Sequence, residues 1–188
     1  LFARRIFQDI SYLHAITHEE EIILNQIFPE TKSFLIPNGI NVKKLNSLQV
    51  IQKQTILFLG RIHPIKNIET LIKSFQKVKA QTNLEWRLVI AGPFVDKKYK
   101  RLLEKLVKSL AIEDCVNFIG EINGKEKEEI IQKAWVLVLP SFNEVIGMVN
   151  LEAALFFTPS ITTNKAGLSN WEQGGGLLIQ PTIESLSK

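Results

Sequence analysis

Two carboxylates, Glu144 and Glu152, lie on either side of Gly147 in the most informative stretch of the chain. An apolar run at 135–139 predicts a buried strand before this stretch, and Gly147 opens a helical pattern. The start of a helix offers free backbone N–H groups that can bind an anion. The two carboxylates can accept hydrogen bonds from hydroxyls around that anion. A phosphate next to a polyol is the chemistry of a nucleotide sugar.

The spacing of the two carboxylates matters for this interpretation. Glu144 and Glu152 are eight positions apart, which on one continuous helix would place them about 80° apart around the axis. A glutamate in a loop and a glutamate in a helix can instead converge on one ligand. The alternative is a surface glutamate followed by a glutamate that the helix dipole favours near the helix start.

A basic loop, 60–67, follows the first predicted strand of the main domain. Gly60 permits a sharp turn, Arg61 can bind two phosphate oxygens at once, and Lys66 adds a compact charge before a helix start. The loop matches neither the Walker pattern nor the spacing of a dinucleotide fingerprint. Two solvated surface cations are therefore the alternative interpretation.

Short apolar runs alternate with amphipathic stretches from Thr55 onward. The predicted strands are 55–59, 87–91, 115–119, 135–139, 160–163 and 177–179. The predicted helices are 68–80, 98–110, 125–134 and 148–157. This alternation predicts a Rossmann-like α/β fold, a parallel sheet with helices on both faces. Ligands of such sheets bind beyond the carboxyl ends of the strands. The expected functional loops are 60–66, 92–96, 120–124, 140–147 and 162–167.

Residues 1–37 have a different pattern, with predicted strands at 12–17 and 33–36 around a helix at 19–27. Pro37-Asn38-Gly39 predicts a turn, and the mixed polar residues after it predict a linker. We expect three parts: 1–37 as the tail of a preceding α/β domain, 38–54 as a linker, and 55–188 as the main domain. The chain begins with Leu rather than Met, which suggests a fragment.

Composition excludes several classes of protein. Hydrophobic residues make up 45% and charged residues 22% of the chain, as in soluble globular proteins. No apolar run reaches the roughly 18 residues of a membrane helix, and we expect no signal peptide. Cys115 is the single cysteine, so we expect a small buried hydrophobe in a reducing, cytoplasmic compartment. The three histidines lack the spacing of metal ligands.

The net charge of +4 is spread over predicted helix faces, most densely at 97–108. A solvated face is the first interpretation, and attraction to phosphates or to an anionic membrane surface is the alternative. Basic residues and aromatics form no common platform, so we do not expect nucleic acid as a partner.

An ordered set of short motifs resembles the C-terminal, donor-binding domain of GT-B retaining glycosyltransferases, the family 4 or group 1 enzymes. The resemblance covers roughly 34–179. The set comprises Pro37-Asn38-Gly39, Gly60-Arg61, Lys66-Asn67, Ala91-Gly92, Phe118-Ile119-Gly120, Leu139-Pro140-Ser141, Glu144 and Glu152-Ala153. Each motif is weak alone, and their order along the chain is specific.

The resemblance implies a role for each site residue. It implies catalytic roles for Arg61, Lys66 and Glu144. It implies donor-binding roles for Gly60, Gly120, Glu121, Ile122, Gly147, Met148, Val149 and Glu152. The two cations would neutralise the donor diphosphate in place of a metal ion, and the N–H groups after Gly147 would hold a phosphate. Glu144 would contact sugar hydroxyls and Glu152 the ribose, with the base near 120–122.

The implied reaction moves a hexose from a UDP- or GDP-sugar to a saccharide or lipid-linked acceptor with retained configuration, in polysaccharide or cell-envelope biosynthesis. No metal or other cofactor is implied, and this chain alone would be inactive. Val145-Ile146 and Phe156-Phe157 depart from the family pattern, although both phenylalanines also fit a core. These departures keep two alternatives open: a non-catalytic, degenerate or split-gene fragment, and a GT-B sugar-nucleotide epimerase.

Overall fold

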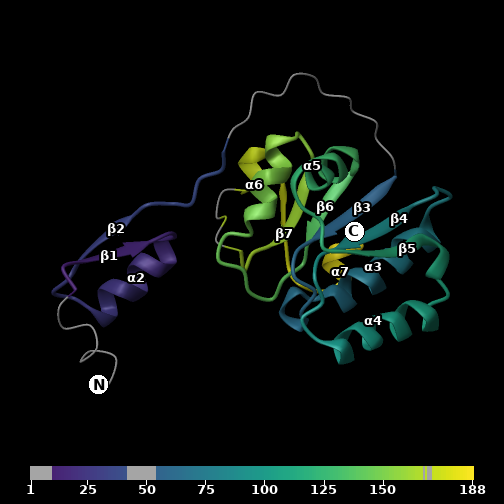
Figure 1. Cartoon of the computed structure of the whole chain (residues 1–188), viewed down its shortest axis with the longest axis horizontal. Coiled ribbons are helices and arrows are strands. Elements are labelled where there is room, and N and C mark those ends of the chain that lie inside the picture. The colour runs from purple at the N-terminus through teal and green to yellow at the C-terminus, as the bar shows by residue number, and fades with distance from the viewer. Residues whose placement is uncertain (1–9, 42–53, 167, 169–170) are drawn as a thin grey trace. The chain divides into compact units, whose positions relative to one another are not determined.

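The computed structural model describes residues 10–41, 54–166, 168 and 171–188 (Figure 1). The chain divides into two compact units, Leu1–Asn41 and Val42–Lys188. Most of the predicted linker, at 42–53, and the last residue of the predicted loop 162–167 lie outside the described residues.

A parallel sheet with strand order β5-β4-β3-β6-β7-β8 forms the larger unit (Figure 1). Its strands are β3 (Thr55–Leu59), β4 (Arg87–Ala91), β5 (Val116–Gly120), β6 (Val136–Leu139), β7 (Ser160–Thr163) and β8 (Leu177–Ile179). The chain runs outward from β3 to β5 and then returns to the other side of β3 at β6. In sheets with such a reversal, ligands usually bind beyond the carboxyl ends of the strands near the point of reversal.

Helices cover both faces of this sheet, as the sequence predicts (Figure 1). They are α3 (Ile68–Gln81), α4 (Lys97–Ser109), α5 (Gly124–Lys133), α6 (Met148–Leu155) and α7 (Ile183–Leu186). Short 3₁₀ turns occur at η1 (Pro64–Lys66), η2 (Glu113–Cys115) and η3 (Trp171–Gly174). Helix α3 packs against α4 and α7 on one face, and α5 and α6 cover the other. The predicted Rossmann-like α/β fold is confirmed.

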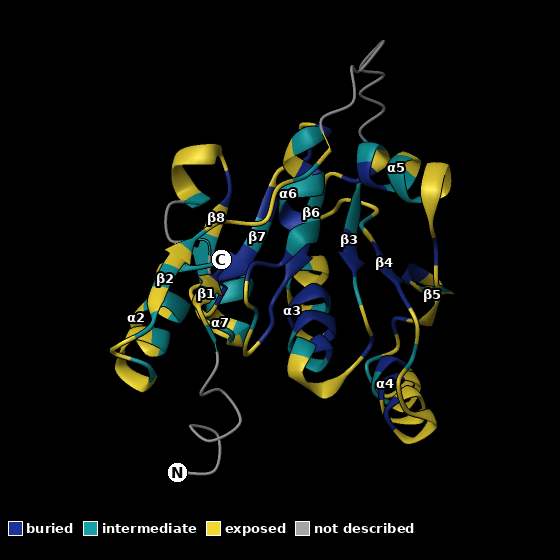
Figure 2. Cartoon of the chain, turned by 60° about the vertical axis from the view of Figure 1, so that its left-hand side comes forward, coloured by how far each residue is buried: buried dark blue, intermediate teal, exposed yellow. Residues whose placement is uncertain are grey.

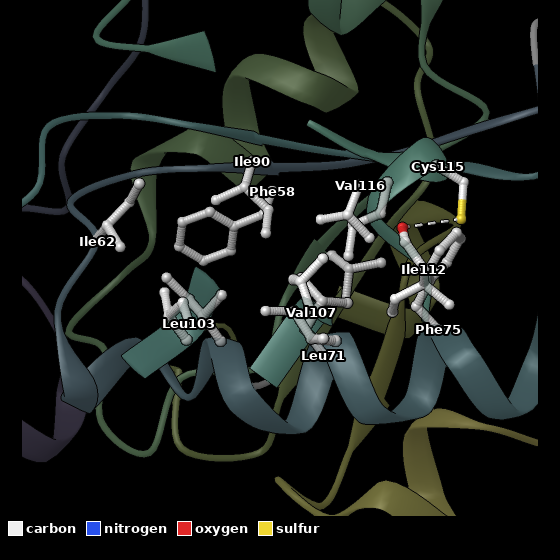
Figure 3. Packing of buried hydrophobic residues seen from close by; sticks show 14 of the residues in the cluster. Phe58, Ile62, Leu71, Phe75, Ile90, Leu103, Val107, Ile112, Cys115 and Val116 are labelled. Atoms are coloured by element: carbon white, nitrogen blue, oxygen red, sulfur yellow. Dashed lines mark hydrogen bonds between the residues drawn. The ribbon is translucent and has the colours of Figure 1, made fainter. Parts of the chain in front are cut away.

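Alternating side chains of β3 explain why both faces are covered. Phe58 packs with the α3 and α4 side chains, whereas Leu57 and Leu59 pack with those of α5 and α6. Figure 2 shows the central strands and the inner side of α3 as buried. Figure 3 shows Phe58 among the buried side chains of the first face, where Cys115 Sγ lies 3.2 Å from the Ile112 carbonyl. The predicted burial of Cys115 is confirmed.

In the smaller unit, the described residues 10–41 form one βαβ motif. Parallel strands β1 (Tyr12–Ala15) and β2 (Lys32–Leu35) are joined by α2 (His18–Ile27). Thr17 caps this helix, because its hydroxyl oxygen accepts a hydrogen bond from the Glu20 N–H at 3.1 Å. No residue of α2 is buried.

The predicted elements agree with the structure within about two residues at each end, and the end of α6 shows a physical reason for one difference. The helix predicted at 148–157 ends at Leu155. Phe156 is buried, so its interpretation as core is right, but Phe157 is 70% exposed and has a φ of 58°. A left-handed residue just beyond a helix turns the chain away from the core. The interpretation of Phe157 as core is wrong.

Candidate functional site

Backbone contacts draw the ends of β3, β4 and β5 together at the carboxyl edge. The Gly60 N–H donates to the Ala91 carbonyl at 3.0 Å, and the Gly92 N–H donates to the Gly120 carbonyl at 2.6 Å. Gly92 has a φ of +138°, and a Cβ atom there would lie 1.9 Å from the Gly60 carbonyl oxygen. Glycine at position 92 therefore permits an approach that any side chain would prevent.

A pocket of about 270 Å³ lies at this edge of the sheet. Loops after β3, β4 and β5 line it together with α5 and α6. The predicted site residues among its lining are Gly60, Arg61, Glu121, Ile122, Met148, Val149 and Glu152. The structure thus gathers residues from separate predicted motifs around one cavity. The predicted residues Lys66, Gly120, Glu144 and Gly147 do not line this pocket.

Gly147 shapes the start of α6, which brings Met148 and Val149 to the pocket. Its φ is +61°, and a Cβ atom there would lie 2.7 Å from Asn150 Nδ2 and 3.1 Å from Glu144 Cγ. No side chain caps this helix. Because the first N–H groups of a helix have no acceptor within it, the start of α6 retains donors and a positive dipole end for an anion.

Lys66 and Glu144 form an ion pair, although they are 78 positions apart in the chain. Lys66 Nζ contacts Glu144 Oε2, and the Ser141 hydroxyl donates to the same oxygen at 3.2 Å. The lysine and glutamate side chains are only 12% and 17% exposed, respectively. The sequence predicts both residues at the site, and the structure adds that they bind one another.

Backbone bonds hold the loop that carries Glu144. The Phe142 N–H donates to the Ile65 carbonyl at 2.9 Å, and the Glu144 N–H donates to the Lys165 carbonyl at 3.2 Å. Asn67, in a left-handed conformation, donates from Nδ2 to the Pro140 carbonyl at 3.1 Å. These bonds fix Glu144 relative to η1 and to the loop after β7.

Lys127 is a pocket residue that the sequence prediction missed. It lies on α5, lines the pocket, and places Nζ 2.8 Å from Oε1 and 2.6 Å from Oε2 of Glu152. The two side chains are 32% and 30% exposed. Its position within the charged run 125–129 is typical of a solvated helix face, so local pattern gave no reason to single it out.

Asn150, in the first turn of α6, was also missed. It is fully buried, and neither polar atom of its side chain has a hydrogen-bond partner among the described residues. Leaving buried polar atoms unpaired costs about 1–3 kcal/mol per group. A polar asparagine within a mostly apolar helix was the sequence signal that could have identified this residue. Its side chain lies so close to Gly147 that a Cβ atom at position 147 would clash with it.

Metal ligands and membrane-spanning helices were not expected from the sequence. In the part of the chain that the structure describes, no three His, Cys, Asp or Glu side chains gather as a metal site would require. Within the same residues, no helix is both long and apolar enough to cross a membrane.

Comparison with known sequences identifies relatives over most of the chain. The family described as "Glycosyl transferases group 1" matches residues 43–188. The uncharacterized glycosyltransferase MJ1607 of Methanocaldococcus jannaschii is 34% identical over 154 residues, covering 74% of this chain and 38% of that protein. The O-antigen chain mannosyltransferase RfbU of Salmonella typhimurium is 30% identical over 154 residues, covering 81% of this chain and 41% of that protein. The chain thus spans less than half the length of these relatives.

Solved structures share the fold. The sucrose-phosphate synthase of Thermosynechococcus elongatus superposes with a TM-score of 0.78 at 24% identity, over 98% of this chain and 49% of that one. Anabaena HepE, solved with UDP and glucose, superposes with a TM-score of 0.80 at 18% identity, over 99% of this chain and 54% of that one. The chain belongs to the glycosyl transferases of group 1, and it has the fold of the C-terminal domain of a GT-B glycosyltransferase.

Proposed function

We propose that the whole protein is a retaining hexosyltransferase and that this chain binds its nucleotide-sugar donor. The hexose would pass from a UDP- or GDP-sugar to a saccharide or lipid-linked acceptor in polysaccharide or cell-envelope biosynthesis. One observation carries the proposal: a single pocket joins Arg61, the open start of α6 and Glu152. These are a cation and free N–H groups for phosphate, and a carboxylate for hydroxyls.

Within this pocket each residue has a proposed task. Arg61 and the N–H groups of Met148 and Val149 bind the diphosphate, and Glu152 accepts hydrogen bonds from the ribose hydroxyls. The base lies against Glu121 and Ile122. The similarity to the mannosyltransferase RfbU, and to a fold neighbour solved with UDP and glucose, supports this class of donor.

Catalysis would depend on charge that develops on the leaving group. As the bond between the anomeric carbon and the diphosphate oxygen breaks, negative charge grows on that oxygen, and Arg61 and Lys66 stabilise it. Lys66 is already paired with Glu144, so the donor diphosphate would share this cation with the glutamate. Glu144 would then be held where it can accept a hydrogen bond from a sugar hydroxyl. We expect no metal ion to be required.

The proposal extends to the rest of the protein. We assign residues 1–37 to the end of an acceptor-binding domain and 38–54 to a linker, so this chain alone would bind a donor and transfer nothing. The buried, free thiol of Cys115 fits the reducing cytoplasm. Helix α4 buries Tyr99, Leu103 and Val107 and exposes lysines, which would suit contact with an anionic membrane surface.

Calorimetric titration with UDP and with GDP tests the donor site. Arg61 is exposed, so Arg61→Ala should leave the fold intact and weaken nucleotide binding about 10- to 100-fold, the value of a charged hydrogen bond. Lys66→Ala should weaken it as well. Arg101→Ala, an exposed cation on α4, is the matched control and should bind normally. Binding that neither Arg61→Ala nor Lys66→Ala changes would refute the phosphate assignment.

A further inference from the structure

We propose that Lys127 is a positioning residue that fixes the Glu152 carboxylate so that it can bind the vicinal diol of the nucleotide ribose. This inference rests on the proposed function, because it deepens the role of the same pocket. Lys127 and Glu152 both line that pocket, from two helices on the same face of the sheet.

The geometry of the pair is specific. Lys127 Nζ donates a hydrogen bond to Glu152 Oε1 at 2.8 Å and lies 2.6 Å from Oε2 in the same ion pair. One ammonium group that contacts both oxygens restrains the rotation of the carboxylate plane. The two residues are 25 positions apart in the chain, so packing of α5 beside α6 creates this contact, not the spacing within one helix.

The position of Lys127 in α5 does not itself stabilise the helix. Lys127 is the fourth residue of α5, close to the helix start at Gly124. The positive end of the helix dipole disfavours a cation there and favours an anion such as Glu126. Glu152, a partner outside the helix, offsets this unfavourable interaction for Lys127.

The remaining capacity of the carboxylate matches a diol. An ionised carboxylate has about four acceptor sites. Lys127 Nζ donates to Oε1, whereas Oε2, 2.6 Å from Nζ, has no hydrogen-bond partner among the described residues. Each oxygen therefore keeps at least one acceptor site for a hydroxyl donor. The ribose 2′ and 3′ hydroxyls are two adjacent donors of this kind. A carboxylate already held in place loses less rotational freedom when the diol binds, so the diol binds more tightly.

Calorimetric titration with two pairs of nucleotides tests this role. The pairs are UDP with 2′-deoxy-UDP, and GDP with 2′-deoxy-GDP. The parent chain should prefer the ribonucleotide by about 10-fold, because the deoxy form leaves one acceptor site of Glu152 without its hydroxyl. In Lys127→Met this preference should fall to about 2-fold, mainly through weaker binding of the ribonucleotide. Lys127→Arg should restore the preference, since it returns a cation with several donors.

A matched control lies on the same helix. Lys133 pairs with Glu129 at 3.2 Å, is about half exposed, and does not line the pocket. Lys133→Met should leave both affinities unchanged. In a Glu152→Gln background, Lys127→Met should have no further effect on the preference, because its target carboxylate is gone.

The outcomes separate this inference from the proposed function. If Lys127→Met weakens the binding of the ribonucleotide and the deoxyribonucleotide equally, Lys127 contacts another part of the ligand. If Lys127→Met changes neither affinity, Lys127 and Glu152 form an ordinary ion pair between two helices. Either result overturns the positioning role while leaving the donor site in place. A parent chain that binds neither UDP nor GDP would instead overturn the proposed function, and this inference with it.

Discussion

The Lys66–Glu144 pair lies among loops and is almost shielded from solvent, whereas the Lys127–Glu152 pair joins two helices and remains about one-third exposed. The first pair is anchored from several sides, because Ser141 donates to Glu144 and backbone bonds hold its loop. The second depends on the packing of α5 beside α6. Breaking the shielded pair should therefore lower the folding stability, whereas breaking the exposed pair should mainly weaken the binding of the nucleotide.

The largest effect is expected from a substitution at Gly92, where the backbone of two loops comes into close contact beside the pocket. Gly92→Ala should destabilise the chain by about 3 kcal/mol and abolish nucleotide binding, because its Cβ would meet the Gly60 carbonyl oxygen at 1.9 Å. Chemical denaturation measures the loss of stability. Gly174→Ala, where a Cβ atom meets nothing within 4 Å, is the control and should have little effect. A fully stable, binding-competent Gly92→Ala would contradict the observed close approach.

The second largest effect is expected from a substitution that breaks the shielded Lys66–Glu144 ion pair. Lys66→Met should cost about 2 kcal/mol of folding stability at neutral pH, because it leaves the Glu144 carboxylate largely buried without its cation. Glu144→Gln in the same background should recover part of this loss, since it removes the uncompensated charge. Lys100→Met is the control, because Lys100 pairs with Glu104 in an exposed position on α4. If Lys66→Met is as harmless as this control, the shielded pair contributes nothing to folding.

Sequence patterns predict the fold more completely than the contacts at the site. The strand at 55–59 and its helix at 68–80 follow from local periodicity, and the structure has them nearly as predicted. The place of Glu152 on a regular helix follows from the same periodicity. The Lys66–Glu144 contact is not encoded locally, because backbone bonds between distant loops bring the two residues together.

Lys127 shows a second limit of sequence reasoning. A lysine among glutamates is typical of a solvated helix face, and its contact with Glu152 exists only once two helices pack on one face of the sheet. Phe157 shows a third limit. Its left-handed backbone at the end of α6 turns an aromatic side chain outward, which a hydrophobic pattern does not predict. Such positions depend on tertiary structure that overrides local preference.

A third carboxylate, Glu69, provides a comparison outside the pocket. The Tyr99 hydroxyl donates to Glu69 Oε2, and burial, followed by this carboxylate, raises the pKa of Tyr99 well above its ordinary value of 10.0. Because the pKa of Tyr99 is higher in the folded than in the unfolded chain, the protonated hydroxyl contributes fully to folding stability below pH 10.0. This contribution is lost progressively as the pH rises above 10.0. Stability should fall by about 1 kcal/mol more in the parent than in Tyr99→Phe between about pH 10 and 11. Parallel stability curves for the two proteins, measured by denaturation across this pH range, would contradict the role of Tyr99.

The smallest effect on stability belongs to the exposed pair. Lys127→Met should cost only about 0.5 kcal/mol, because solvent screens a pair that is about one-third exposed. Lys133→Met on the same helix, whose pair is more exposed still, should cost no more than this. Denaturation of the two variants beside Lys66→Met measures the contrast directly. A loss for Lys127→Met as large as that for Lys66→Met would remove the distinction between the two pairs. A small loss of stability, together with a reduced preference for the ribonucleotide, would mean that Lys127 contributes chiefly to ligand binding. Lys66 would then contribute both to ligand binding and to folding stability.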